Sequence, residues 1–200
     1  MRLKDFILDL LFPQFCISCQ REGSVLCPDC LSTIEVTEIL FCPFCSKPNP
    51  IMKCKKHLPK SLDGLFSAVE DNQPLTQKMI KNLPGLKILA RPLASLIIAH
   101  IFLSENKSIF QLGENSGLLA LPVSLKERKK MGFNRNEEIA KELSRFFKIK
   151  VIKKYSDEKR IFLVTDVYSK ETDMEEMAVL LKEQGAESVF GVVVTRVAGK

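Results

Sequence analysis

Arg160-Ile-Phe-Leu-Val-Thr-Asp-Val167, followed by Tyr168-Ser-Lys-Glu171, combines a short apolar run with a polar loop. An apolar run of this length is typical of a strand buried in a parallel sheet. A helix is predicted to begin at Thr172, because Thr172 and Glu175 have the spacing of a capping box. Four apolar residues then recur on one helical face: Met174, Met177, Ala178 and Leu181. Gly185 stands where a glycine commonly ends a helix.

The order of strand, tight loop and helix N-terminus is the usual geometry for holding a phosphate. The backbone N–H groups of the first helical turn point toward the ligand, and the helix dipole favours negative charge there. The loop from Tyr168 to Thr172 is therefore the first candidate for a binding site.

Strands and helices alternate from residue 65 onward. Further strands are expected at Leu65–Glu70, Gly117–Val123, Lys150–Lys153 and Ser188–Thr195. Helices are expected to start at Pro74 and Asn134 and to span residues 91–102. This alternation predicts an α/β domain over residues 61–200, with a mainly parallel central sheet flanked by helices. Ligands of such sheets bind beyond the carboxyl ends of the strands, where the Tyr168 loop would meet a basic loop at Ser124–Gly132.

Residues 1–60 form a separate module with four pairs of potential metal ligands. All seven cysteines and one of the two histidines make up these pairs: Cys16 with Cys19, Cys27 with Cys30, Cys42 with Cys45, and Cys54 with His57. Two intervening residues let both members of a pair reach one Zn²⁺ from a tight turn, and a tetrahedral site needs two pairs. The spacing predicts a double zinc-ribbon module with one or two Zn²⁺ ions. Consecutive or alternate pairs could share a metal, and the sites are expected to be structural because protein ligands fill them.

The rest of the composition sets wider limits. No apolar run approaches the ~18 residues of a membrane span, and residues 2–11 are expected to form a short amphipathic helix that packs on the protein. No signal-peptide cleavage pattern follows, so a cytoplasmic location is expected, where cysteines indicate metal rather than disulfides. The formal net charge of +6 permits an acidic partner such as nucleic acid.

Several segments, in this order, resemble the ComF family of bacterial competence-associated proteins. Leu10-Leu-Phe-Pro-x-x-Cys16 and the cysteine pairs after it resemble the family's opening, and Pro122 through Gly132-Phe-Asn134 resembles its Gly-Phe-Asn loop. Leu75–Lys81 with Ala90-Arg-Pro-Leu-Ala94 resembles the segment that carries its pyrophosphate-side loop. Leu163–Val167 falls on the strand before its loop for phosphoribosyl pyrophosphate (PRPP). The resemblance implies a zinc ribbon joined to a type I phosphoribosyltransferase-like domain, with a role in DNA uptake.

The resemblance also implies where PRPP would bind. A retained site would use the loop residues Thr165, Asp166, Ser169, Lys170 and Thr172, the pyrophosphate-side residues Lys81 and Asn82, and Mg²⁺. This chain departs from the family pattern, which has aspartate at the position of Thr165, glycine at that of Glu171 and glutamine at that of Arg135. Glu171 and Asp173 also place carboxylates beside the helix N-terminus, where they would repel a phosphate. The PRPP site is therefore predicted to be degenerate, and no residue is assigned a catalytic role.

Three functions are compatible with these features. The favoured one is a ComF-like factor that acts by binding single-stranded DNA or other competence proteins, without catalysis. The alternatives are an active PRPP-dependent phosphoribosyltransferase and a zinc-dependent protein-interaction adaptor. Two basic clusters would contact nucleic acid: Lys126, Arg128, Lys129, Lys130 and Arg135, and Lys53, Lys55, Lys56 and Lys60. Both clusters are equally compatible with solvated loops.

Overall fold

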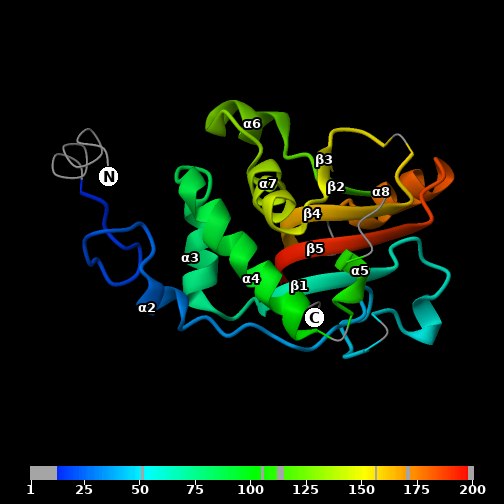
Figure 1. Cartoon of the computed structure of the whole chain (residues 1–200), viewed down its shortest axis with the longest axis horizontal. Coiled ribbons are helices and arrows are strands. Elements are labelled where there is room, and N and C mark those ends of the chain that lie inside the picture. Colours follow the sequence, from blue (N-terminus) through cyan, green and yellow to red (C-terminus); the bar gives the residue numbers. More distant parts are fainter. Residues whose placement is uncertain are drawn as a thin grey trace.

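Five parallel strands form one sheet at the centre of the molecule (Figure 1). The computed structural model describes residues 13–50, 52–104, 106–111, 115–155, 157–169 and 172–197. The strands are β1 (Gly64–Glu70), β2 (Ser116–Ala120), β3 (Lys150–Ile152), β4 (Arg160–Tyr168) and β5 (Ser188–Arg196). They lie in the order β1-β5-β4-β2-β3, and the pairings between these strands are all parallel. The expected α/β fold with a parallel sheet is confirmed.

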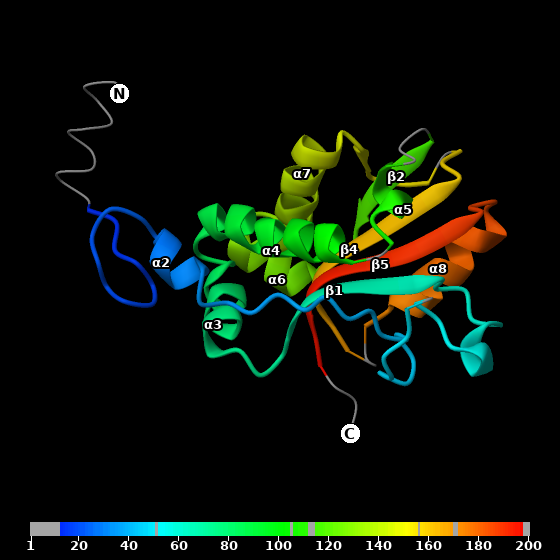
Figure 2. The same ribbon diagram turned by 60° about the horizontal axis from the view of Figure 1, so that its bottom comes forward.

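Helices cover both faces of the sheet (Figure 2). The longer ones are α3 (Pro74–Asn82), α4 (Ala90–Leu103), α7 (Arg135–Phe147) and α8 (Met174–Glu183). The short ones are α2 (Pro28–Leu31), η1 (Lys55–His57), η2 (Lys87–Leu89), α5 (Ser108–Gln111) and α6 (Leu125–Met131). On one face α4 packs on β1 and β5 and α7 packs on β4 and β2, whereas α8 packs on β5 from the other face. None of the described helices is long and apolar enough to cross a membrane.

The central strand β4 contributes to two separate apolar cores. Phe162 and Val164 belong to the core beneath α4 and α7, whereas Ile161 and Leu163 belong to the core beneath α8. Successive side chains of a strand point to opposite faces, so a strand that is apolar at every position needs cover on both sides. This explains why the run that begins at Arg160 is continuous rather than alternating.

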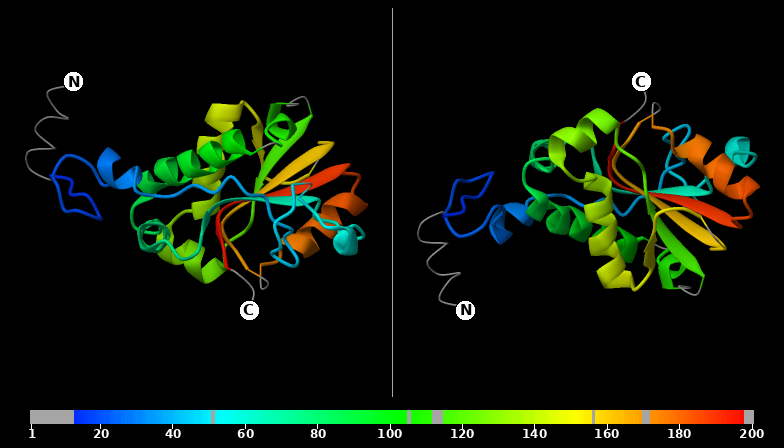
Figure 3. Two further views of the ribbon diagram at one scale, coloured as in Figure 1. Left: turned by 90° about the horizontal axis from the view of Figure 1, so that it is seen from below. Right: turned by 90° about the horizontal axis from the view of Figure 1, so that it is seen from above.

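The cysteine-rich segment divides into two ribbons that lie at different places on the α/β domain. Residues 16–30 project beyond α3, whereas residues 42–57 lie at the other end of β1 (Figures 1 and 3). The segment between them passes beside β1, where the Thr37 N–H donates to the Ala68 carbonyl at 2.9 Å. The buried His100 of α4 also places Nδ1 2.5 Å from the Thr37 carbonyl oxygen. These contacts cover part of the edge of the sheet, which would otherwise expose unpaired backbone groups.

The predicted basic loop at Ser124–Gly132 is wrong, because residues 125–131 form helix α6. Ser124 Oγ accepts from the N–H of Glu127, and the Glu127 carboxylate accepts from the N–H of Ser124. This capping box starts the helix, and Gly132 ends it in the left-handed conformation with φ of 74°.

The predicted capping box of Thr172 and Glu175 is also wrong. Thr172 Oγ1 accepts from the N–H of Ser169 at 2.9 Å, and Asp173 takes the N-cap position of α8. The glycine predicted to follow α8 is confirmed, since Gly185 has a φ of 112° two residues after the last helical residue. The amphipathic helix predicted for residues 2–11 lies outside the described residues.

Candidate metal centres and a hollow at the strand ends

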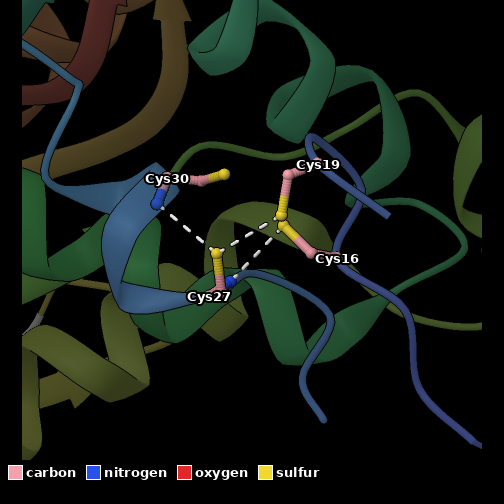
Figure 4. A group of neighbouring side chains, drawn as sticks. All are labelled: Cys16, Cys19, Cys27 and Cys30. Carbon is pink, nitrogen blue, oxygen red and sulfur yellow. Dashed lines mark hydrogen bonds between the residues drawn. The ribbon is translucent and has the colours of Figure 1, made fainter. Parts of the chain in front are cut away.

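The first ribbon holds four cysteine side chains around one point (Figure 4). Cys16, Cys19, Cys27 and Cys30 have sulfur atoms within 4.8 Å of one another. A tight turn brings the first pair together, because the Gln20 N–H donates to the Cys16 carbonyl and Gln20 adopts a φ of 61°. Backbone N–H groups also point at the sulfurs, with Cys27 N 3.5 Å from Cys16 Sγ and Cys30 N 3.4 Å from Cys27 Sγ.

The second ribbon repeats this construction with one histidine. Its four ligand atoms, from Cys42, Cys45, Cys54 and His57, lie within 4.8 Å of one another. The Ser46 N–H donates to the Cys42 carbonyl, as Gln20 does in the first ribbon. Cys54 starts the short helix η1, which turns His57 back so that Nδ1 lies 3.1 Å from Cys54 Sγ.

Both groups have the dimensions and the chemistry of tetrahedral zinc sites. A Zn–S bond of ~2.3 Å implies sulfur atoms about 3.8 Å apart around a tetrahedral ion. The distances are 3.7 Å between the sulfurs of Cys19 and Cys27 and 3.8 Å between those of Cys45 and Cys54. Each group is formed by two pairs that are consecutive in the sequence. This arrangement decides between the consecutive and alternate pairings that the spacing left open. Protein ligands fill both sites, so bound Zn²⁺ would stabilise the fold and would have no open position for a substrate.

The electrostatic environment prepares one thiol in each group for a metal. Burial raises the pKa of Cys16, but hydrogen bonds from the backbone of Cys27, Cys19 and Ser18 outweigh it and lower the pKa from 9.0 to about 6. The pKa of Cys42 is likewise lowered to about 6, since backbone hydrogen bonds outweigh its burial. A thiolate is the form that binds zinc, so these N–H groups favour the ligand state.

A family model of the double zinc ribbon domain matches residues 7–60. The N-terminal module is a double zinc ribbon. The match includes both groups of four ligands, and it ends close to the predicted domain boundary after residue 60, which stays a prediction. A comparison with curated protein sequences gives no match to the chain.

The second half of the double zinc ribbon is joined to the ends of strands β4 and β5. The Tyr168 hydroxyl donates to the Pro43 carbonyl at 3.2 Å, and the guanidinium of Arg196 lies 3.7 Å from the centre of the Phe41 ring. Just after the ribbon, the N–H groups of residues 61 and 62 donate to the carboxylate of Glu175 in the first turn of α8. Phe41 and Pro43, at the start of this ribbon, therefore contact the last residues of β5 and β4.

A small hollow of about 290 Å³ lies at these carboxyl ends, between the strand ends and the beginnings of α6, α7 and α8. Its polar lining comes from three segments of the chain: Ser124 and Glu127, Arg135 and Asn136, and Thr165, Asp166, Ser169, Thr172 and Asp173. This is the place where open α/β sheets bind their ligands. The candidate loop residues Thr165, Asp166, Ser169 and Thr172 are thus brought together.

Asp166 is the most buried charged group of the hollow, with 1% of its surface exposed. Arg135 Nε lies 2.8 Å from Asp166 Oδ2, in an ion pair that is out of line for a hydrogen bond. The Val167 N–H donates to Asp166 Oδ1 at 2.9 Å. Burial raises the pKa of Asp166, and the charge of Arg135 opposes that rise. The carboxylate is therefore neutralised from within the protein.

Asn136 fixes the strand ends on either side of this pair. Its Oδ1 accepts from the Asp166 N–H at 3.2 Å, and its Nδ2 donates to the Leu121 carbonyl at 3.0 Å. Sequence reasoning missed Asn136 and Glu127 as members of the hollow. The signal for Glu127 was its capping-box spacing from Ser124, whereas the role of Asn136 depends on where α7 packs.

Some candidate residues are not part of the described hollow. Lys81 and Asn82 lie in the last turn of α3 and are not among its lining residues. Lys170 and Glu171 lie outside the described residues, so the predicted repulsion by Glu171 stays a prediction. Asp173 is exposed and does line the hollow.

The two predicted basic clusters are partly used within the protein. The buried Lys53 places Nζ 2.7 Å from the Lys60 carbonyl and 3.3 Å from Asp63, so it is not available to a phosphate. Arg135 is likewise engaged with Asp166. The exposed members are Lys55, Lys56 and Lys60 on the second ribbon and Arg128 and Lys129 on α6, while the side chains of Lys126 and Lys130 lie outside the described ones.

Proposed function

We propose that this chain is a ComF-like zinc protein whose α/β domain binds a partner instead of transferring a phosphoribosyl group. The observation that carries the proposal is the ion pair of Arg135 with the buried Asp166. A ribose diol donates its hydroxyl hydrogens and would need the same carboxylate oxygens. Displacing Arg135 would leave the buried Asp166 carboxylate without its partner, at a cost of about 2–4 kcal/mol that PRPP would have to supply before it gained any contact.

Single-stranded DNA is the partner that we propose. Five exposed basic residues support it, three on the second ribbon and two on α6: Lys55, Lys56, Lys60, Arg128 and Lys129. None of them takes part in a described ion pair. Lysine and arginine side chains without an acidic partner can contact phosphates without reading sequence.

A filter-binding titration with a single-stranded oligonucleotide at several salt concentrations tests the DNA proposal. We expect the affinity to fall as salt rises, with a logarithmic slope of about −0.7 for each phosphate contact. Replacing Lys55 and Lys56 by alanine should reduce the slope, and so should replacing Arg128 and Lys129. The matched control replaces Lys78 and Lys107, two exposed lysines elsewhere on the surface, and should leave the slope unchanged. Binding without salt dependence, or no binding, contradicts the proposal.

The hollow itself favours one alternative, an active PRPP-dependent transferase. It keeps hydroxyl groups at Ser169 and Thr172 beside the start of α8, where a phosphate could accept hydrogen bonds. Calorimetry with PRPP and Mg²⁺ separates the two functions. We expect no binding heat for the wild-type chain, and micromolar binding would favour the transferase. Arg135→Gln, which releases Asp166, is the variant in which weak binding should first appear.

A further inference from the structure

A second and larger cavity lies beside the hollow, at the carboxyl ends of β2 and β3, with α8 on one side and α7 on the other. Its volume is about 710 Å³, and small-molecule sites typically have about 300–1,000 Å³. Leu121 and Ile152, from the ends of β2 and β3, line one side, and Met177 and Leu180 of α8 line another. The cavity therefore lies toward the carboxyl ends of these strands, as ligand sites of open α/β sheets do.

The cavity lies where the described part of the connection from β3 to β4 forms no helix. These parallel strands are separated by β2 in the sheet, and only residues 153–159 join them. A parallel crossover normally contains a helix that covers the sheet face. On the α8 face of the sheet, α8 itself packs on β5. Beside it, Leu119 of β2 is buried, whereas Ile152 of β3 stays half-buried.

The rim of this cavity is basic. Lys153 and Lys154 follow β3, Arg128 comes from α6 and Lys141 from α7, and Glu137 is the one acidic residue among the described lining residues. Lys141 pairs with Glu138 at 2.7 Å, whereas Lys153, Lys154 and Arg128 have no described acidic partner. An apolar cavity with an unneutralised basic rim is complementary to an anion that carries an apolar body.

Two lining residues favour an aromatic body over a flexible chain. Met177 presents a polarizable sulfur, which makes favourable contacts with ring edges. Tyr155 offers an aromatic ring against which the ligand's ring can pack. Its hydroxyl lies beside the end of α8, because a Cβ placed on Gly185 would lie 3.2 Å from it. We propose that this cavity binds a small aromatic anion, with its ring among Leu121, Met177 and Tyr155 and its carboxylate or phosphate at Lys153 and Lys154.

The proposed site is distinct from the hollow at Asp166 and does not depend on the proposed DNA function. The two share a wall at residues 121–123 and Met177, but the ion pair of Arg135 with Asp166 belongs to the hollow alone. A ligand of the larger cavity would therefore bind without breaking that pair.

Methyl-labelled methionine in the full zinc-loaded chain provides the test, with 2-naphthoate as the probe. We expect the NMR signal of Met177, assigned with Met177→Leu, to shift saturably, while Met79, which is fully buried in the other core, stays unchanged. The cation 2-naphthylmethylammonium has the same ring system. Its affinity should be at least about tenfold lower, because the basic rim repels it. No saturable shift at Met177, or equal affinity for both probes, overturns the proposal.

Charge reversal at the rim distinguishes specific binding in the cavity from nonspecific binding to an apolar surface. Lys153→Glu with Lys154→Glu should weaken naphthoate about tenfold, and both side chains are exposed, so the fold should be retained. Lys78→Glu with Lys107→Glu makes the same change in net charge elsewhere and should leave the affinity unchanged. Leu180→Glu, at a side chain that is 50% exposed on α8, places a carboxylate in the cavity and should abolish binding. Equal losses in the rim variant and its control would contradict the proposal.

Discussion

Asp166 lies two residues before the end of strand β4 and Arg135 is the first residue of helix α7, and their charged atoms lie 2.8 Å apart. The carboxylate is almost fully buried, whereas the guanidinium side chain is 24% exposed. An ion pair of this kind contributes little net stability, but loss of one partner leaves a buried charge without compensation. The ion pair affects function directly, because Arg135 contacts the Asp166 carboxylate that the ribose hydroxyls would need.

Arg135→Gln should lower the free energy of unfolding by about 2–4 kcal/mol near neutral pH. Burial already raises the pKa of Asp166, and without Arg135 that pKa rises further. The folded chain then binds this proton more readily than the unfolded chain does, so the loss should shrink as the pH falls through the raised pKa. Urea unfolding of the wild-type chain and of Arg135→Gln at several pH values measures this loss. A loss that is the same at every pH would contradict the assignment.

His100 predicts a second pH effect with the opposite sign. Burial lowers its pKa below the ordinary 6.5, and its ring is fully buried against Thr37. Below that value the unfolded chain takes a proton that the folded chain does not, so stability falls as the pH falls, by at most about 1.4 kcal/mol per pH unit. His100→Asn, which can still donate to the Thr37 carbonyl, should flatten this dependence. If the two unfolding curves keep the same pH slope, His100 is not held neutral.

At the scale of elements, Glu175 connects α8 to the residues that directly follow the double zinc ribbon. The N–H groups of Ser61 and Leu62 lie 3.0 and 2.9 Å from its two carboxylate oxygens. Glu175→Ala should destabilise the chain by about 2–3 kcal/mol, because it leaves two backbone donors unpaired and one of them is buried. Glu176→Ala, at the exposed next position of the same turn, should cost much less. Equal losses in urea unfolding would show that the tether has no role.

The same elements show where sequence reasoning reaches its limit. The apolar runs of β4 and β5 and the amphipathic face of α8 could be predicted, because burial on known faces imposes those periods. The loop predicted at Ser124–Gly132 was wrong because α6 is short and charged, so its only helical signals are its caps. Glu175 has capping-box spacing but bonds to residues 61 and 62, and no local pattern reports a partner so distant in the chain.

At the scale of the whole molecule, the two zinc groups should differ in their importance for the fold. Wild-type protein should release two Zn²⁺ per chain in a colorimetric assay, and Cys19→Ser and Cys45→Ser should each release one. The second ribbon contacts the ends of β4 and β5, so Cys45→Ser should lower Tm by at least about 5 °C more than Cys19→Ser. A larger effect of Cys19→Ser would contradict this packing.

Sequence-based prediction was most successful for features that are determined by residues close together in the chain. Ligand spacing identified all eight metal-site candidates, because each pair is set by one turn. The pairing of the ligands, the ion pair of Arg135 with Asp166 and the cavity beside α8 depend on how distant elements pack. Such contacts could not be predicted from a single sequence. The arginine at position 135, where the ComF pattern has glutamine, was a local signal of the altered site.

The central claim is that Arg135 neutralises the acid at the end of β4 and so excludes PRPP. A crystal of the zinc-loaded chain soaked with PRPP and Mg²⁺ tests it most directly. We predict that the hollow holds no sugar and that Arg135 Nε remains in contact with Asp166. Density for a ribose diol on Asp166, with Arg135 displaced, would contradict the account.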